Sequence, residues 1–129
     1  MTRYLLDTTA LIDFSKGRAP ARSRILQMIE QGDELGVCCI NVAEFYSGLP
    51  PEQRSRWVEF FGALSYWGIT REIAQRAGAW RNDYARQGRP LSTSDVLIAA
   101  TAHTNRSIIM TNNVRDFPMP EVQALSLKD

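Results

Sequence analysis

The sequence predicts an α/β domain in which helices cover both faces of a central, mostly parallel sheet. Short apolar runs, such as residues 4–6 and 107–110, have the length and composition of buried strands. Helical segments separate these runs, and strands that alternate with helices pair in parallel. The length suits a single domain over residues 1–129, which is long enough to bury a core.

The N-terminal half alternates strands with helices. A strand at residues 4–6 precedes a short apolar helix at residues 10–14, and a longer helix at residues 21–31 ends at Gly32. A second buried strand is expected at residues 35–40. Asn41 is a favourable N-cap for the helix that follows.

That helix ends near Leu49, because Pro50 and Pro51 cannot continue it. Residues 52–61 form the next expected helix. Its aromatic residues recur at helical spacing, which we interpret as core or helix–helix packing.

The C-terminal half continues the alternation. A short strand at residues 64–67 precedes a helix at residues 71–87, whose apolar side chains recur on one face. The segment 96–103 is almost wholly apolar, so we expect a buried helix there. Strands at residues 107–110 and 122–127 complete the sheet.

Composition excludes several classes of function. No apolar run approaches the roughly 20 residues that span a bilayer, and the N-terminus does not resemble a signal peptide, so we expect a cytoplasmic protein without membrane contact. Cys38 and Cys39 are adjacent and are interpreted as buried strand thiols. With His103 as the single histidine, the chain offers neither a zinc quartet nor a histidine-based triad.

The net charge of +1 gives no bulk attraction for nucleic acid. Nearly all basic residues are arginines, however, and only Lys16 and Lys128 are lysines. Arginine suits bidentate phosphate contacts, so Arg81 and Arg86 are candidates for such contacts. A solvated charged helix face is the simpler explanation for these two residues, and a compositional bias explains the excess of arginine equally well.

Four acids stand at strand ends or helix starts, and each has a structural explanation. Asp7 is placed to cap a helix, Glu44 to close a capping box with Asn41, and Asp95 to interact with a helix dipole. Together with Asp116 they converge on one edge of a parallel sheet, where crowded carboxylates repel one another unless a cation neutralises them. A ligand set made only of oxygen favours Mg²⁺ or Mn²⁺, which activates water and holds a phosphate oxygen.

Four short motifs carry a family resemblance: LLDTTALIDF, INVAEFYSGL, LSTSDVLIAATA and TNNVRDF. Through their order and spacing the chain resembles the PIN-domain ribonucleases, and among them the VapC-type toxins of toxin–antitoxin pairs. The resemblance covers nearly the whole chain. It implies a PIN-like three-layer α/β/α fold and a Mg²⁺- or Mn²⁺-dependent endoribonuclease that hydrolyses RNA.

The resemblance also implies roles for particular residues. Asp7 and Asp95 would be the firmest metal ligands, and Glu44 and Asp116 would complete the site, partly through water. The implied supporting residues are Thr111, Asn113 and Thr8.

Three partners follow from the same resemblance: an RNA substrate, a second copy of the chain in a homodimer, and a small antitoxin. The C-terminal segment of the antitoxin would block the cleft and its N-terminal part would bind DNA, so that the toxin meets DNA only indirectly. Four aromatic residues could contact the antitoxin or could equally be core: Trp57, Phe60, Phe61 and Tyr46.

Two other classes share a small α/β domain with an acidic edge. A receiver-like, Mg²⁺-binding regulatory module needs an acid pair after the first strand and a late lysine, and the chain has only Asp7 and no lysine between Lys16 and Lys128. A phosphatase of the haloacid dehalogenase type needs a second acid two residues after Asp7, where Thr9 stands.

Overall fold

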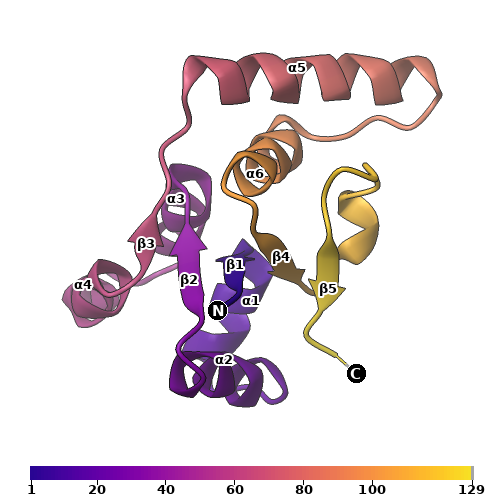
Figure 1. Cartoon of the computed structure of the whole chain (residues 1–129). Coiled ribbons are helices and arrows are strands. Elements are labelled where there is room, and N and C mark those ends of the chain that lie inside the picture. Colours follow the sequence, from indigo (N-terminus) through magenta and orange to yellow (C-terminus); the bar gives the residue numbers. More distant parts are fainter. Residues whose placement is uncertain (129) are drawn as a thin grey trace.

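The computed structural model describes residues 1–128 and consists of one sheet covered by helices (Figure 1). All strands are parallel and lie in the order β3-β2-β1-β4-β5. The strands are β1 (Arg3–Leu6), β2 (Glu34–Val37), β3 (Ser65–Tyr66), β4 (Ile108–Thr111) and β5 (Ala124–Ser126). Each predicted strand is therefore present, and the parallel sheet is confirmed.

The helices that alternate with these strands also match the prediction, apart from their ends. They are α1 (Thr8–Ser15), α2 (Ala21–Glu30), α3 (Cys39–Ser47), α4 (Arg54–Gly62), α5 (Arg71–Arg86) and α6 (Thr93–Thr104). Two short 3₁₀ helices are η1 (Pro51–Gln53) and η2 (Val114–Asp116).

Successive strand residues point to opposite faces of the sheet and so build two cores. Leu5 and Ile109 belong to the core that α5 and α6 complete. Leu6 and Met110 belong to the core on the other face, with residues of α1, α2 and α3. This is the predicted three-layer arrangement, and it brings the carboxyl ends of the strands to one edge.

The end of the second strand differs from the prediction. The strand stops at Val37 instead of residue 40, and Cys39 is an exposed helix residue rather than a buried strand thiol. Asn41 is not the N-cap. It lies inside α3, where its Oδ1 accepts from the backbone N–H of Cys38 (3.0 Å) and from the Cys38 thiol (3.3 Å). A helix can therefore begin two residues earlier than the expected cap.

The aromatic residues of α4 pack against two other helices. Phe60 stacks on Phe14 of α1, with ring centroids 5.1 Å apart. Trp57 and Phe61 contact Phe45 of α3 at 5.5 and 5.0 Å. The interpretation of this stripe as helix–helix packing is confirmed.

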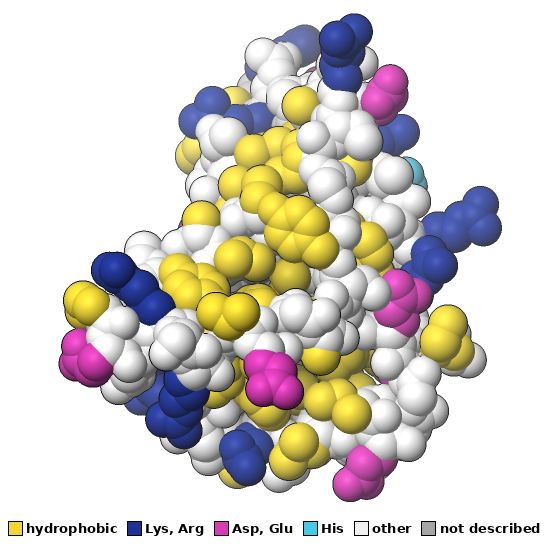
Figure 2. All heavy atoms as spheres, turned by 90° about the vertical axis from the view of Figure 1, so that its left-hand side faces the viewer, with side chains coloured by type: hydrophobic (Ala, Val, Ile, Leu, Met, Phe, Trp, Pro, Cys, Tyr) yellow, Lys and Arg dark blue, Asp and Glu magenta, His cyan; other side chains and the backbone are white. Residues whose placement is uncertain are grey.

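The same region leaves apolar side chains at the surface. Figure 2 shows hydrophobic side chains gathered over the side of the molecule on which α4 and β3 lie. On these elements Val58 is 63% exposed and Tyr66 is 61% exposed. No helix within residues 1–128 is long and apolar enough to cross a membrane.

Gly36 of β2 lies directly under Trp67, which follows β3, so a substitution at Gly36 tests how closely this segment packs on the sheet. A methyl group at this buried position would overlap the rigid indole ring of Trp67. We expect Gly36→Ala to lower the free energy of unfolding in urea by about 1–3 kcal/mol.

Gly78→Ala is the matched control, because a methyl group there meets open space within α5. It should raise the free energy of unfolding by about 0.5–1 kcal/mol. If Gly36→Ala and Gly78→Ala changed the free energy of unfolding equally, the close packing of Trp67 on Gly36 would be contradicted.

Candidate functional site

Asp7 lies directly after β1 and is only 7% exposed. Its backbone N–H donates to the carbonyl of Met110 in β4 at 3.0 Å, which continues the pairing of the two strands. Although Asp7 occupies the N-cap position of α1, its side chain makes no capping bond. The capping explanation for this carboxylate is therefore wrong.

Thr111 holds the Asp7 carboxylate in place. Its hydroxyl, at the end of β4, is fully buried and donates to Asp7 Oδ2 at 2.7 Å. The same Oγ1 accepts from the backbone N–H of Asn113 at 2.9 Å. Thr111 thus joins the end of β4 to the end of β1. It was predicted as a supporting residue, and it contacts Asp7, a predicted metal ligand.

Glu44 reaches the same edge from α3. Its carboxylate accepts from the hydroxyl of Thr8, Oγ1 to Oε1, at 2.6 Å. Glu44 does not close a capping box with Asn41, because the N-cap is Cys38 and Asn41 itself occupies the third helical position. The side chain of Glu44 is exposed.

Asp95 and Asp116 complete the predicted acids. Asp95 lies in the first turn of α6, where its backbone N–H donates to the Ser92 hydroxyl at 3.0 Å. Asp116 lies in η2 and donates its N–H to the carbonyl of Asn113 at 3.0 Å. Both side chains are partly buried.

The carboxylates act on one another electrostatically. Burial raises the pKa of Asp7, and the negative charges of Glu44 and Asp116 raise it further, against the lowering effect of the Thr111 hydroxyl and of the backbone N–H of Thr8.

Burial is also the main cause that raises the pKa of Asp95, partly offset by the Ser92 hydrogen bond. The negative charges of Asp116, Asp7 and Glu44 add to the rise. The structure therefore brings the four predicted acids into one electrostatic neighbourhood.

This neighbourhood is not a finished coordination sphere. Within residues 1–128, no three Asp, Glu, His or Cys side chains are arranged closely enough to hold a metal ion as they stand. The chemistry of the group still fits a hard cation, because all four donors are carboxylates and a positive charge would offset both their burial and their repulsion.

Sequence reasoning missed a second set of contacts beside Thr111. The Thr9 hydroxyl accepts from the N–H of Asn112 at 3.1 Å, and the Asn112 side chain donates to Asp13 Oδ2 at 2.7 Å. These bonds tie the loop after β4 to α1. The polar residues of the two motifs were visible in the sequence, but nothing in their spacing paired them.

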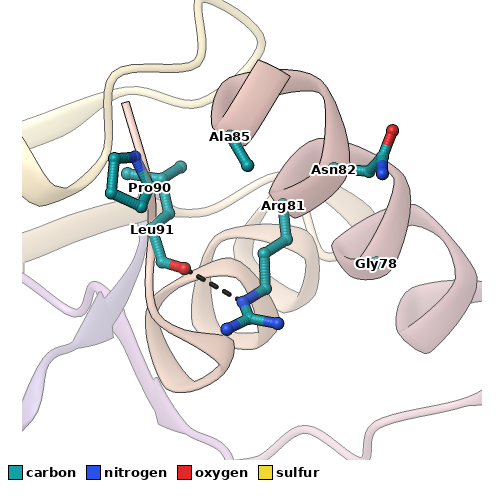
Figure 3. Close-up of a pocket in the computed structure, with 6 residues that line it drawn as sticks. All are labelled: Gly78, Arg81, Asn82, Ala85, Pro90 and Leu91. Atoms are coloured by element: carbon teal, nitrogen blue, oxygen red, sulfur yellow. Dashed lines mark hydrogen bonds between the residues drawn. The ribbon is translucent and has the colours of Figure 1, made fainter. Parts of the chain in front are cut away.

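Arg81 contacts the protein backbone. Its Nε donates to the carbonyl of Leu91 at 3.1 Å, just before the Ser92 cap of α6 (Figure 3). The surrounding hollow of about 390 Å³ lies between α5 and the segment at Pro90. Arg81 thus helps to place the helix that carries Asp95, whereas phosphate contact by Arg86 stays a prediction.

Comparison with known proteins decides the family. The PIN domain family model matches residues 4–120. The chain belongs to the PIN domain family. It is 31% identical over 120 residues to Ribonuclease VapC19 of Mycobacterium tuberculosis, a match that covers 92% of this chain and 96% of that protein.

Other relatives place it more narrowly. The tRNA(fMet)-specific endonuclease VapC of Shigella flexneri is 30% identical over 122 residues, or 91% of both chains. A DNA-bound VapBC complex from Salmonella typhimurium matches with a TM-score of 0.81 and 25% identity, over 98% of this chain and 99% of that one. This PIN domain is therefore a VapC-type ribonuclease toxin of a type II toxin–antitoxin system.

The match confirms the predicted family, fold and ribonuclease class, and it decides against the receiver-like and phosphatase alternatives. PIN ribonucleases are typically metal-dependent. The roles of individual residues rest on the geometry described above.

The raised pKa values predict how stability depends on pH in the absence of divalent ions. Asp7 binds its proton more tightly in the folded than in the unfolded chain, so its contribution to stability falls as pH rises above 3.8 through the folded pKa. We expect Asp7→Asn to be more stable than the wild type in EDTA, by a margin that grows as the pH rises above about 4.

Urea unfolding at several pH values measures this margin. Asp83→Asn, which removes an exposed carboxylate of α5, should show no such growth. A margin for Asp7→Asn that is constant or shrinks with pH would contradict the account of a buried, uncompensated carboxylate.

Proposed function

We propose that this VapC-type toxin cleaves RNA with Mg²⁺ or Mn²⁺ held by Asp7, Glu44, Asp95 and Asp116. The observation that carries the proposal is the gathering of these acids at one sheet edge. Asp7 accepts from Thr111 at the end of β4, Glu44 accepts from Thr8 next to Asp7, and Asp116 follows β4 in η2. Burial and the neighbouring negative charges raise the pKa of Asp7 and that of Asp95. A divalent ion bound there would activate a water molecule for hydrolysis of a phosphodiester bond.

The protein contributes two rigid and two movable ligands. Thr111 fixes the buried carboxylate of Asp7, and the Ser92 cap anchors the turn of Asp95. Glu44 is exposed and is oriented by Thr8, so its longer side chain can turn toward an ion without disturbing the core. Asp116, on a short 3₁₀ helix, is placed to close the set, partly through water.

RNA with an accessible backbone suits this site best. The acids gather where the parallel strands end, and the phosphates of an unpaired RNA strand reach a metal held there more easily than those of a duplex do. The name of the Shigella relative makes a tRNA the first substrate to test.

Substitution of the rigid ligands tests the proposal. Asp7→Asn and Asp95→Asn should each lower Mn²⁺-dependent RNA cleavage by at least about 100-fold, because they remove a carboxylate ligand. Thr111→Val, which leaves the ligands intact but frees Asp7, should cost about 10- to 100-fold.

RNA end sequencing after brief induction, with Asp83→Asn as the control, measures these effects. Cleavage should also stop on addition of EDTA. An Asp7→Asn protein that cuts RNA as well as the wild type would refute the assignment.

The partners form a second part of the proposal. A small antitoxin would cover the acids and bind DNA itself, and the toxin would form a homodimer. The Salmonella VapBC complex is bound to DNA, and the net charge of only +1 gives the toxin itself no bulk attraction for nucleic acid. The proposal includes a cytoplasmic site of action, because the RNA substrate and the DNA that the antitoxin would bind are found there.

The apolar surface on α4 and β3 is suited to a protein partner. Val58 and Tyr66 are largely exposed there, and β3 is an edge strand with unpaired backbone groups. We expect Val58→Asp to keep the fold but weaken association about 10-fold or more.

Sedimentation equilibrium of the toxin, alone and with the antitoxin from an adjacent reading frame, measures this association. Gln27→Asp adds the same charge on exposed α2 and serves as the control. Unchanged association of Val58→Asp with itself and with the antitoxin would show that this surface is not an interface.

A further inference from the structure

A groove lies beside Asp116 and Thr111, where β4 and β5 end. It has a volume of about 630 Å³. Its walls are formed by Asn112, Asn113, Val114, Arg115 and Ser126, and we call it the β4–β5 groove. We propose that it binds the nucleotide adjacent to the cleaved bond of a single-stranded RNA, an inference that rests on the proposed function.

The groove lies close to the buried acid Asp7. Thr111, which donates to Asp7, pairs with Ser126 across β4 and β5. Ser126 therefore lies two strand spacings, about 10 Å, from the strand that Asp7 follows, with Thr111 between them. The short helix η2 joins the two places, because it carries Asp116 of the acidic set and also Val114 and Arg115 of the groove.

The charge of the groove differs from that of the acidic site beside it. None of the five lining residues is acidic, whereas the neighbouring site is formed by carboxylates. The Arg115 side chain is exposed, and among residues 1–128 it makes no hydrogen bond or ion pair; only its backbone carbonyl is used. A phosphate next to the cleaved one would be repelled by the acids unless such a cation paired with it.

The lining of the groove combines an apolar side chain with polar ones. Val114 is 40% exposed and offers an apolar surface to a nucleobase. Asn113 presents an exposed amide, and Ser126 presents a hydroxyl that lies at the opposite wall. Such groups can hydrogen-bond a ribose 2′-hydroxyl or a base edge, which are the features that proteins use to recognise single-stranded RNA.

The groove is also held in shape before any ligand arrives. Arg89 Nη2 donates to the carbonyl of Arg115 at 2.9 Å, and Asn113 N–H donates to Thr111 Oγ1 at 2.9 Å. On the other wall Arg24 Nη1 lies 3.5 Å from the carbonyl of Ser126. A preformed wall loses less conformational entropy on binding, which favours a true subsite over a casual surface hollow.

Binding of a fluorescein-labelled single-stranded oligoribonucleotide in EDTA tests the groove without cleavage. Arg115→Gln should weaken binding about 10-fold. It should also reduce the steepness of the plot of log K against log salt concentration by about 0.7, the value for one phosphate contact on a single strand. Arg115→Lys, which keeps the charge, should retain most of the salt dependence.

Arg106→Gln is the matched control. It removes an exposed arginine that precedes β4, at the opposite edge of the sheet from Arg115. RNA binding by this variant should equal that of the wild type. Equal weakening by the two glutamine variants would show a general charge effect and would overturn the proposal, as would unchanged binding of Arg115→Gln.

Cleavage of the same oligoribonucleotide with Mn²⁺ separates the two proposals. If Arg115 binds a neighbouring phosphate, the loss in Arg115→Gln should appear mainly in KM. A wild type that cleaves while Arg115→Gln shows unchanged KM and binding would reject the groove and leave the proposed function intact. A wild type that fails to cleave any RNA would reject the proposed function itself.

Discussion

The hydrogen bond from Thr111 to Asp7 is the interaction on which the rest of the site depends. A buried carboxylate without a compensating partner destabilises a fold, because it loses the water that solvates its charge. The Thr111 hydroxyl returns part of that solvation at 2.7 Å and fixes the direction of the carboxylate. The remaining cost is visible in the raised pKa of Asp7, and a bound cation is the natural way to remove it.

The parallel sheet explains why this bond can form at all. Asp7 and Thr111 are far apart in sequence, yet they stand at the ends of neighbouring strands β1 and β4. Crossover helices return the chain so that every strand points the same way, and polar residues that follow the strands gather at one edge. The edge therefore collects acids from distant motifs, and their places at strand ends and helix starts are the sequence signal that they will meet.

The same edge has two electrostatic characters that suit a polyanionic substrate. The acids would hold the proposed divalent cation, whereas the lining of the β4–β5 groove contains no carboxylate and includes Arg115. Asp116 and Arg115 are sequence neighbours on η2, so one short helix contributes to both. A chain with a net charge of only +1 can in this way present positive charge where a flanking phosphate would lie.

The sequence by itself determined the order of strands and helices, the family and the candidate acids. The hydrophobicity of each strand and the order of the motifs can both be read along the chain without knowing which residues become neighbours. It did not reveal that Cys38 rather than Asn41 begins α3, since a buried amide can bond to the backbone from inside a helix. Only the tertiary structure decided against a capping role for Asp7 and for Glu44. Asp7 does not cap its helix and Glu44 bonds to Thr8, because those partners become neighbours only when the sheet and the helices pack together.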